Sequence, residues 1–214
     1  VFLNCTSLSS IVIPDSVTSI GVYAFNNCTS LKEVKLSKEL TNIGHYAFKD
    51  CSQLTEISIP DKVQTMGANT FENCTSLTNV TIGKGVLNIG DYIFAGCTDL
   101  INVIIPDNVR KIQTCAFLNC VKLKNLKIPK NIELIGDYAF GYTYNTTYEK
   151  IKDLPITIFN HYFIGKNSIN LKTQEAREYL PNIQHFKKQG HLCAEECGIE
   201  CNYCFECAKK LEKI

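Results

Sequence analysis

The sequence lacks an excess of either charge sign, because 22 Lys and Arg residues are balanced by 21 Asp and Glu residues. This balance gives no bulk electrostatic attraction to nucleic acid or to an anionic membrane. No run approaches the roughly 18–20 apolar residues of a membrane-spanning helix, and no signal peptide is visible. Nucleophile elbows, phosphate loops and HExxH motifs are also missing, and the four histidines are scattered. The sequence therefore indicates a protein that is not an enzyme.

Cysteine, in contrast, is abundant and regularly spaced. Six cysteines recur every 23 residues, at Cys5, Cys28, Cys51, Cys74, Cys97 and Cys120. A strict period of this length indicates a tandem array in which each unit buries its apolar side against the next. The hydrophobic content of 45% is enough for a substantial core.

The six units share the consensus Cys-x-x-Leu-x-x-Ile-x-Ile-Pro-x-x-Val-x-x-Ile-Gly-x-x-Ala-Phe-x-x. The Leu-x-x-Ile-x-Ile part alternates and is rich in β-branched residues, which predicts a short strand that the following proline ends. Val-x-x-Ile-Gly predicts a second, shorter extended segment. Ala-Phe-x-x-Cys predicts one or two turns of helix, and equivalent strands should stack in parallel about 4.8 Å apart.

Two segments illustrate a family resemblance: CTSLKEVKLSKELTNIGHYAF, from Cys28, and CTSLTNVTIGKGVLNIGDYIF, from Cys74. They resemble the BspA-like class of leucine-rich repeats, found in surface-associated adhesins of anaerobic bacteria and parasitic protozoa. The resemblance implies a leucine-rich-repeat-like solenoid with a parallel β-sheet and short helical turns. It also implies a recognition or adhesion module that is secreted or at the cell surface and binds a protein or glycan through the repeat sheet.

The sequence divides the chain into three parts, and the resemblance covers only the first of them. Residues 1–142 form the solenoid of six 23-residue units, residues 143–190 an irregular last coil with a short helix, and residues 191–214 a Cys-rich cap. The chain opens inside a repeat, because residues 1–5 match residues 24–28. We therefore expect an array truncated at its N-terminus.

Positions on the first strand that the core does not need are predicted to bind the ligand. They are Lys32, Lys35, Thr55, Ser58, Thr78, Thr81, Ile101, Ile104, Lys124 and Lys127. Ile101 and Ile104 would form an apolar spot in a polar surround, which can mark a protein contact. The alternative interpretations are a solvated sheet surface or a surface covered by the tail.

The regular cysteines are interpreted as core residues, because their period matches that of the Leu and Phe positions and one thiol per coil makes no tetrahedral metal site. No cofactor is expected in the repeats. Cys115 falls outside this series, in the slot of Tyr23, Tyr46, Tyr92 and Tyr138, and is expected to be partly exposed.

A second cysteine cluster ends the chain. It comprises His191, Cys193, Cys197, Cys201, Cys204 and Cys207. These residues could hold a structural zinc ion, form disulfides, or line one face of a helix that packs on the last repeat. A zinc-binding tail would suit the alternative function, an intracellular (cytoplasmic) protein-interaction scaffold.

Five Asn-x-Ser/Thr sequences occur, of which three belong to the repeat consensus Asn-Cys-Thr. Asn145 lies in a polar stretch after the repeats and is the predicted glycan acceptor if the protein is exported from a eukaryotic cell.

Overall fold

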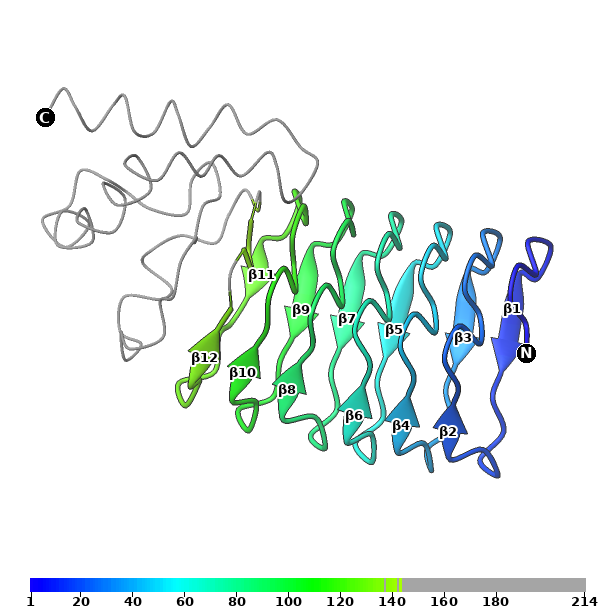
Figure 1. Ribbon diagram of the computed structural model, residues 1–214, viewed down its shortest axis with the longest axis horizontal. Coiled ribbons are helices and arrows are strands. Elements are labelled where there is room, and N and C mark those ends of the chain that lie inside the picture. Colours follow the sequence, from blue (N-terminus) through cyan, green and yellow to red (C-terminus); the bar gives the residue numbers. More distant parts are fainter. Residues whose placement is uncertain (137, 142, 144–214) are drawn as a thin grey trace, which may run out of the picture. The chain divides into compact units, whose positions relative to one another are not determined.

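The computed structural model describes residues 1–136, 138–141 and 143, in which the chain winds into six stacked coils with two short strands each (Figure 1). The odd-numbered row comprises β1 (Ser10–Val12), β3 (Glu33–Lys35), β5 (Glu56–Ser58), β7 (Asn79–Thr81), β9 (Asn102–Ile104) and β11 (Asn125–Leu126). The even-numbered row comprises β2 (Ser19–Ile20), β4 (Asn42–Ile43), β6 (Thr65–Met66), β8 (Asn88–Ile89), β10 (Lys111–Ile112) and β12 (Leu134–Ile135). The predicted parallel β-solenoid is confirmed.

Neighbouring coils pair in parallel with a constant offset. Ile11 lies opposite Val34 in the odd-numbered row, and Ile20 lies opposite Ile43 in the even-numbered row. The strand ladders are interrupted between β3 and β5 and between β6 and β8. The turns still connect the coils there, as where the Phe71 amide donates to the Ile93 carbonyl at 2.9 Å. The pairing therefore keeps the period of the cysteines across the whole described array.

The core is built from lanes, a lane being a set of residues that recurs every 23 positions. One lane stacks seven phenylalanine rings, with centroids of consecutive rings 5.0 to 5.5 Å apart: Phe2, Phe25, Phe48, Phe71, Phe94, Phe117 and Phe140. A second lane, Leu31, Leu54, Leu77, Leu100 and Leu123, is buried beside it. Burying such side chains contributes about 1.5–3 kcal/mol each, so these lanes dominate the stability of the array.

The predicted helical turns are wrong. The part of the chain that the structure describes contains no helix, and hence none that could cross a membrane. In the first five coils, the segment after the even-numbered strand instead contains two residues with left-handed backbone angles. In the first coil these are Tyr23 and Asn27, with φ of 56° and 57°. An α-helix needs right-handed angles throughout, so two left-handed residues within five positions turn the chain tightly instead.

The expected exposure of Cys115 is also wrong, because this thiol is buried. It packs with Ala95 and Leu118, and the partly buried Tyr92 and Tyr138 close the cluster on either side. Two flanking tyrosines and the apolar residues Ala95 and Leu118 therefore cover a residue that its slot alone placed near the surface.

Three glycines that follow even-numbered strands, Gly44, Gly67 and Gly136, each have a backbone neighbour too close for a side chain. A Cβ at Gly67 would lie 2.3 Å from the His45 nitrogen, whereas a Cβ at Gly21 would meet nothing within 4 Å. We expect Gly67→Ala to lower the free energy of unfolding by about 1–3 kcal/mol, because the third coil must shift away from the second. Gly21→Ala should change it by less than about 0.5 kcal/mol.

Urea denaturation followed by circular dichroism compares the two variants. Equal midpoints would show that the second and third coils are not packed this closely. The expected effect applies to Gly67 and not to every coil, because the repeat does not require glycine at this position throughout. In the fifth coil the same position is occupied by Gln113.

Candidate functional site

The outward side of the odd-numbered strands, called the sheet face below, carries the side chains predicted to bind a ligand. In β5 and β7 a buried middle residue lies between two exposed ones. Of the predicted residues, Thr78 and Ile101 are half-buried, and the others are exposed: Lys32, Lys35, Thr55, Ser58, Thr81, Ile104, Lys124 and Lys127. All ten thus lie at the surface, and ligand binding by them stays a prediction.

The sequence analysis missed one lane of the sheet face. Glu33, Glu56, Asn79 and Asn102 precede the inward residue of their strands, and the first three are exposed while Asn102 is half-buried. Strict alternation about the inward residue was the signal that could have found them, because both of its neighbours in a strand point outward. The predicted residues Lys32, Thr55, Thr78 and Ile101 form another lane, which begins at Ser9. The sequence analysis assigned this lane to the strand, but each of its residues lies one position before the strand begins.

The middle of the sheet face is polar, and its amides bond to one another. The Asn79 amide donates to the Thr78 hydroxyl at 2.9 Å, and the Asn102 amide donates to the Asn79 side-chain oxygen at 2.6 Å. The Thr78 hydroxyl in turn donates to the Thr55 carbonyl at 3.0 Å. These bonds fix the side chains of the third to fifth coils and leave a pre-organised surface.

The apolar spot lies next to this polar strip, in the fifth coil. Ile104 is 63% exposed although it is a large aliphatic residue, and Ile101 is half-buried. The sixth coil adds Lys124 and Lys127, and the Lys127 ammonium lies 3.7 Å from the Asp107 carboxylate. Both partners of that pair are largely exposed, so the pair is weak and can exchange for a ligand carboxylate.

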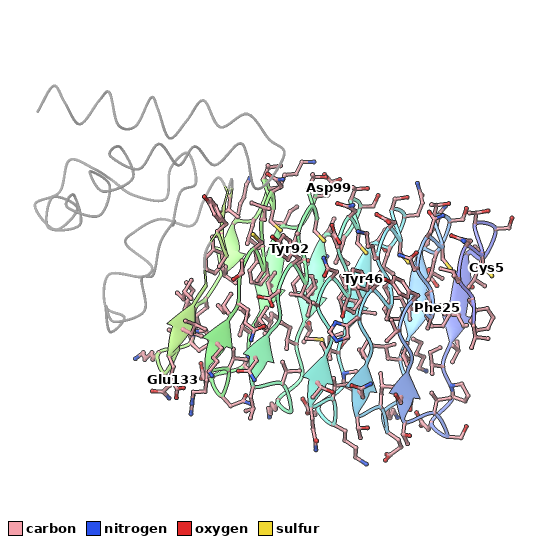
Figure 2. All side chains as sticks on the ribbon, viewed as in Figure 1. Cys5, Phe25, Tyr46, Tyr92, Asp99 and Glu133 are labelled. Atoms are coloured by element: carbon pink, nitrogen blue, oxygen red, sulfur yellow. The ribbon has the colours of Figure 1, made fainter. Side chains whose placement is uncertain are left out.

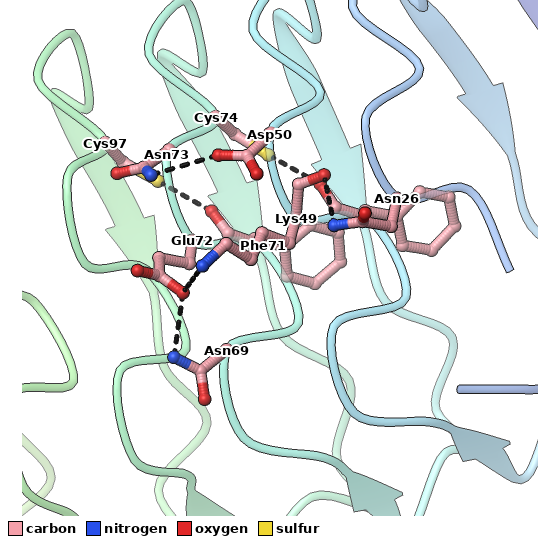
Figure 3. Close-up of polar contacts among 10 residues, drawn as sticks. Asn26, Lys49, Asp50, Asn69, Phe71, Glu72, Asn73, Cys74 and Cys97 are labelled. Carbon is pink, nitrogen blue, oxygen red and sulfur yellow. Dashed lines mark hydrogen bonds and ion pairs between the residues drawn. The ribbon is translucent and has the colours of Figure 1, made fainter. Parts of the chain in front are cut away.

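The regular cysteines serve the core. From Cys28 onward, each thiol donates to a Phe carbonyl 26 residues earlier, with Sγ···O distances of 3.1 to 3.2 Å. Figure 3 shows the bonds of Cys74 and Cys97 in the third to fifth coils. Burial raises the pKa of the Cys51 thiol to about 12 and those of Cys74 and Cys97 well above the usual range. These thiols stay protonated near neutral pH and donate to backbone carbonyls, which assigns them a structural role in the core.

A polar lane runs just before the cysteines. The Asn27 amide donates to the Asn4 side-chain oxygen, and the Asn73 amide donates to the Asp50 carboxylate, both at 3.0 Å (Figure 3 for the second). Three Asn-Cys-Thr sequences fall in this lane, so in two of them the nitrogen that would carry a glycan is already bonded. Asn145, the predicted acceptor, lies outside the described residues.

The wall formed by the turns after the even-numbered strands carries tyrosines, of which Tyr46 and Tyr92 are visible in Figure 2. The Tyr23 and Tyr46 rings stack with centroids 4.8 Å apart, and the Lys49 ammonium lies 5.8 Å from the Tyr46 centroid. The Glu72 carboxylate, 2.8 Å from Lys49 and hydrogen-bonded to it, raises the pKa of the lysine. These side chains bind one another from coil to coil, so the wall is stabilised within the chain.

The predicted metal or disulfide cluster lies outside the described residues. It comprises His191, Cys193, Cys197, Cys201, Cys204 and Cys207. In residues 1–136, 138–141 and 143, no three His, Cys, Asp or Glu side chains gather as a metal site would require. The zinc, disulfide and helical-stripe hypotheses for the tail all stay predictions.

A family model described as a BspA-type leucine-rich repeat region in six copies matches residues 1–120 and 87–187. The second match continues past residue 142, where the repeats were expected to end. The comparison with curated proteins gave no match.

Solved structures with the same fold include a leucine-rich cell surface protein from Faecalibacterium prausnitzii, 42% identical, with a TM-score of 0.58. The match covers 62% of this chain and 36% of that one. A leucine-rich repeat protein from T. pallidum is 28% identical over 77% of both chains, with a TM-score of 0.60. Another, from Bacteroides ovatus, is 27% identical over 64% of this chain and 42% of that one, with a TM-score of 0.52. The chain thus spans less than half the length of the first and third of these.

Proposed function

Because the chain belongs to the BspA-type leucine-rich repeat family, we propose that it is a non-enzymatic adhesion or recognition module of the cell surface that binds a protein partner. The binding site is the sheet face. A relative with 42% identity is a cell surface protein, and repeat arrays in general present extended binding surfaces.

The exposed Ile104 beside the polar strip carries the proposal. An aliphatic side chain with a polar surround is typical of the centre of a protein contact. The sheet face holds four lysines, Lys32, Lys35, Lys124 and Lys127, and two glutamates, Glu33 and Glu56. A partner segment that combines apolar and acidic residues complements it best.

The face favours a protein over a glycan or another small ligand. Small-molecule sites are concave and rich in aromatic side chains. The three outward lanes of the sheet face, from Ser9 to Lys127, contain no aromatic residue. An extended peptide can contact several coils at once, at about 4.8 Å per coil.

Peptides selected from a random phage-displayed library against the full chain test this site. We expect them to carry apolar and acidic residues and to bind the Ile104→Asp variant at least about tenfold more weakly than the unchanged chain. Val22→Asp is the matched control, because Val22 is also exposed but lies outside the sheet face, and it should leave the affinity unchanged.

Two results would count against the proposal. One is a set of peptides that bind the Ile104→Asp variant as well as the unchanged chain. The other is a failure to select peptides together with binding to a glycan array, which would assign the chain to carbohydrate recognition.

A further inference from the structure

The bend that follows each odd-numbered strand carries a lane of alternating charge. These bends form one edge of the array, where each odd-numbered strand leads to the next even-numbered one (Figure 1). The lane reads Asp15, Lys38, Asp61, Lys84, Asp107, Lys130, and all six residues are exposed. None of the other 22 positions of the repeat carries a charge in all six coils.

Hydrogen bonds to the backbone hold two of the acidic residues in place. The Asp15 carboxylate accepts from the Lys38 amide, and the Asp61 carboxylate accepts from the Lys84 amide, both at 2.9 Å. These bonds use main-chain donors and leave the lysine ammonium groups out. The lane is thus a set of charges with fixed spacing.

Within the described part of the chain, the ammonium groups of this lane take part in no ion pair. Among the described residues, the ammonium groups of Lys38, Lys84 and Lys130 have no carboxylate within 4.0 Å. If the alternating charges served only to pair neighbouring coils, each lysine ammonium group would lie against the aspartate carboxylate of the adjacent coil. Asp107 instead lies 3.7 Å from Lys127 of the sheet face, in an exposed and therefore weak pair. All six side chains remain exposed, at intervals of about 4.8 Å.

We propose that this edge, the alternating-charge edge, binds a second copy of the chain in antiparallel orientation. Reversal of an alternating lane of six gives its complement, so the edge pairs with itself about a two-fold axis between the third and fourth coils. The facing pairs are Asp15 with Lys130, Lys38 with Asp107, and Asp61 with Lys84, each formed twice. A two-fold interface requires this self-complementarity.

The neighbouring lanes permit the same arrangement. In the lane one residue further on, the axis sets Glu39 opposite Asn108 and Lys62 opposite Gly85, so no like charges meet. Three residues after the charge lane, in the same bend of the fourth coil, Leu87 is 52% exposed beside the axis. At this place Leu87 can contact the facing edge of the second copy, while the ion pairs fix how the two copies are aligned.

The association should be weak and sensitive to salt. The edge is narrow, about 24 Å long over five steps between coils, and would bury less surface than a stable dimer needs. Exposed ion pairs contribute little individually and are screened at high ionic strength. Such contacts become significant where copies are concentrated, as on a surface.

Sedimentation velocity of the full chain at up to about 1 mM tests the proposal. We expect reversible dimers at 50 mM salt, at least about tenfold weaker at 500 mM. Lys84→Asp places like charges across the axis at two sites and should weaken the dimer at least about tenfold. Asp61→Lys should do the same.

The double variant, Asp61→Lys with Lys84→Asp, restores opposite charges across the axis and should recover the dimer to within about threefold of the original. Thermal melting of all four chains checks that folding is retained. A monomer at every concentration would overturn the proposal. So would a dimer that ignores salt and both single changes, or a double variant that stays as weak as the single variants although folded.

Discussion

Replacing Phe94 by alanine should lower the free energy of unfolding by about 3–5 kcal/mol, the largest effect expected from one substitution in the array. The Phe94 side chain is fully buried and stacks on Phe71 and Phe117, with ring centroids 5.5 and 5.4 Å away. Its loss opens a cavity that touches three coils, and each coil of a solenoid is stabilised only by its neighbours. Urea denaturation followed by circular dichroism measures the change.

Ile104→Ala is the matched control, because Ile104 is an aliphatic residue of similar bulk that is largely exposed. It should change the free energy of unfolding by less than about 0.5 kcal/mol. If Phe94→Ala were as mild as this control, the stacked phenylalanine lane would not be the core of the array.

The regular cysteines should be almost inert toward alkylation in the folded chain. A thiol with a pKa of about 12, as at Cys51, is ionised to about one part in ten thousand at pH 8. A thiol with the ordinary pKa of 9.0 is ionised to about one part in ten, so Cys51 should react about a thousandfold more slowly. Burial of the sulfur slows the reaction further.

Timed alkylation at pH 8, with peptide mapping by mass spectrometry, measures each thiol separately. Cys51, Cys74 and Cys97 should be modified at the ordinary rate only in urea, while the half-buried Cys5 should react faster in the folded chain. Folding favours the protonated thiols, so the free energy of unfolding should fall as pH rises from about 9 toward 12. Equal rates with and without urea would contradict the buried positions of these sulfurs.

The period and the inward lanes could be predicted from sequence because each is repeated six times. Ile11, Ile57 and Val103 recur at one offset from a cysteine, and the strands pair with that offset. The repeat left little freedom for the register, since a slip by one residue would turn the apolar side of every strand outward.

The turns could not be predicted in the same way. Tyrosine and cysteine do not favour a left-handed backbone, yet Tyr46 and Cys115 adopt φ of 58° and 54°. The tertiary fold imposes this conformation, and hydrogen bonds between coils hold it, as where the Tyr46 amide donates to the Ala68 carbonyl at 3.1 Å. Sequence patterns near Ala-Phe therefore indicated a helix that the coil geometry does not allow.

Two of the three outward lanes of the sheet face were visible in the sequence. Ile101, Ile104 and the lysines were predicted, but the lane of Glu56, Asn79 and Asn102 was missed, although alternation about the inward residue of each strand places it outward. The burial of Cys115 depends on Leu118 and on tyrosines from neighbouring coils. Contacts of that kind arise only when the coils are stacked.

The most direct test of the sheet face as the binding site is a methyl NMR titration. Isoleucine δ1 methyl groups are labelled in the full chain, and a peptide selected from the phage library is added. The Ile104 and Ile101 signals should shift with peptide concentration, while those of buried residues such as Ile43 and Ile89 should stay in place. If the Ile101 and Ile104 signals are unchanged while other methyl groups shift, the chain binds through another surface.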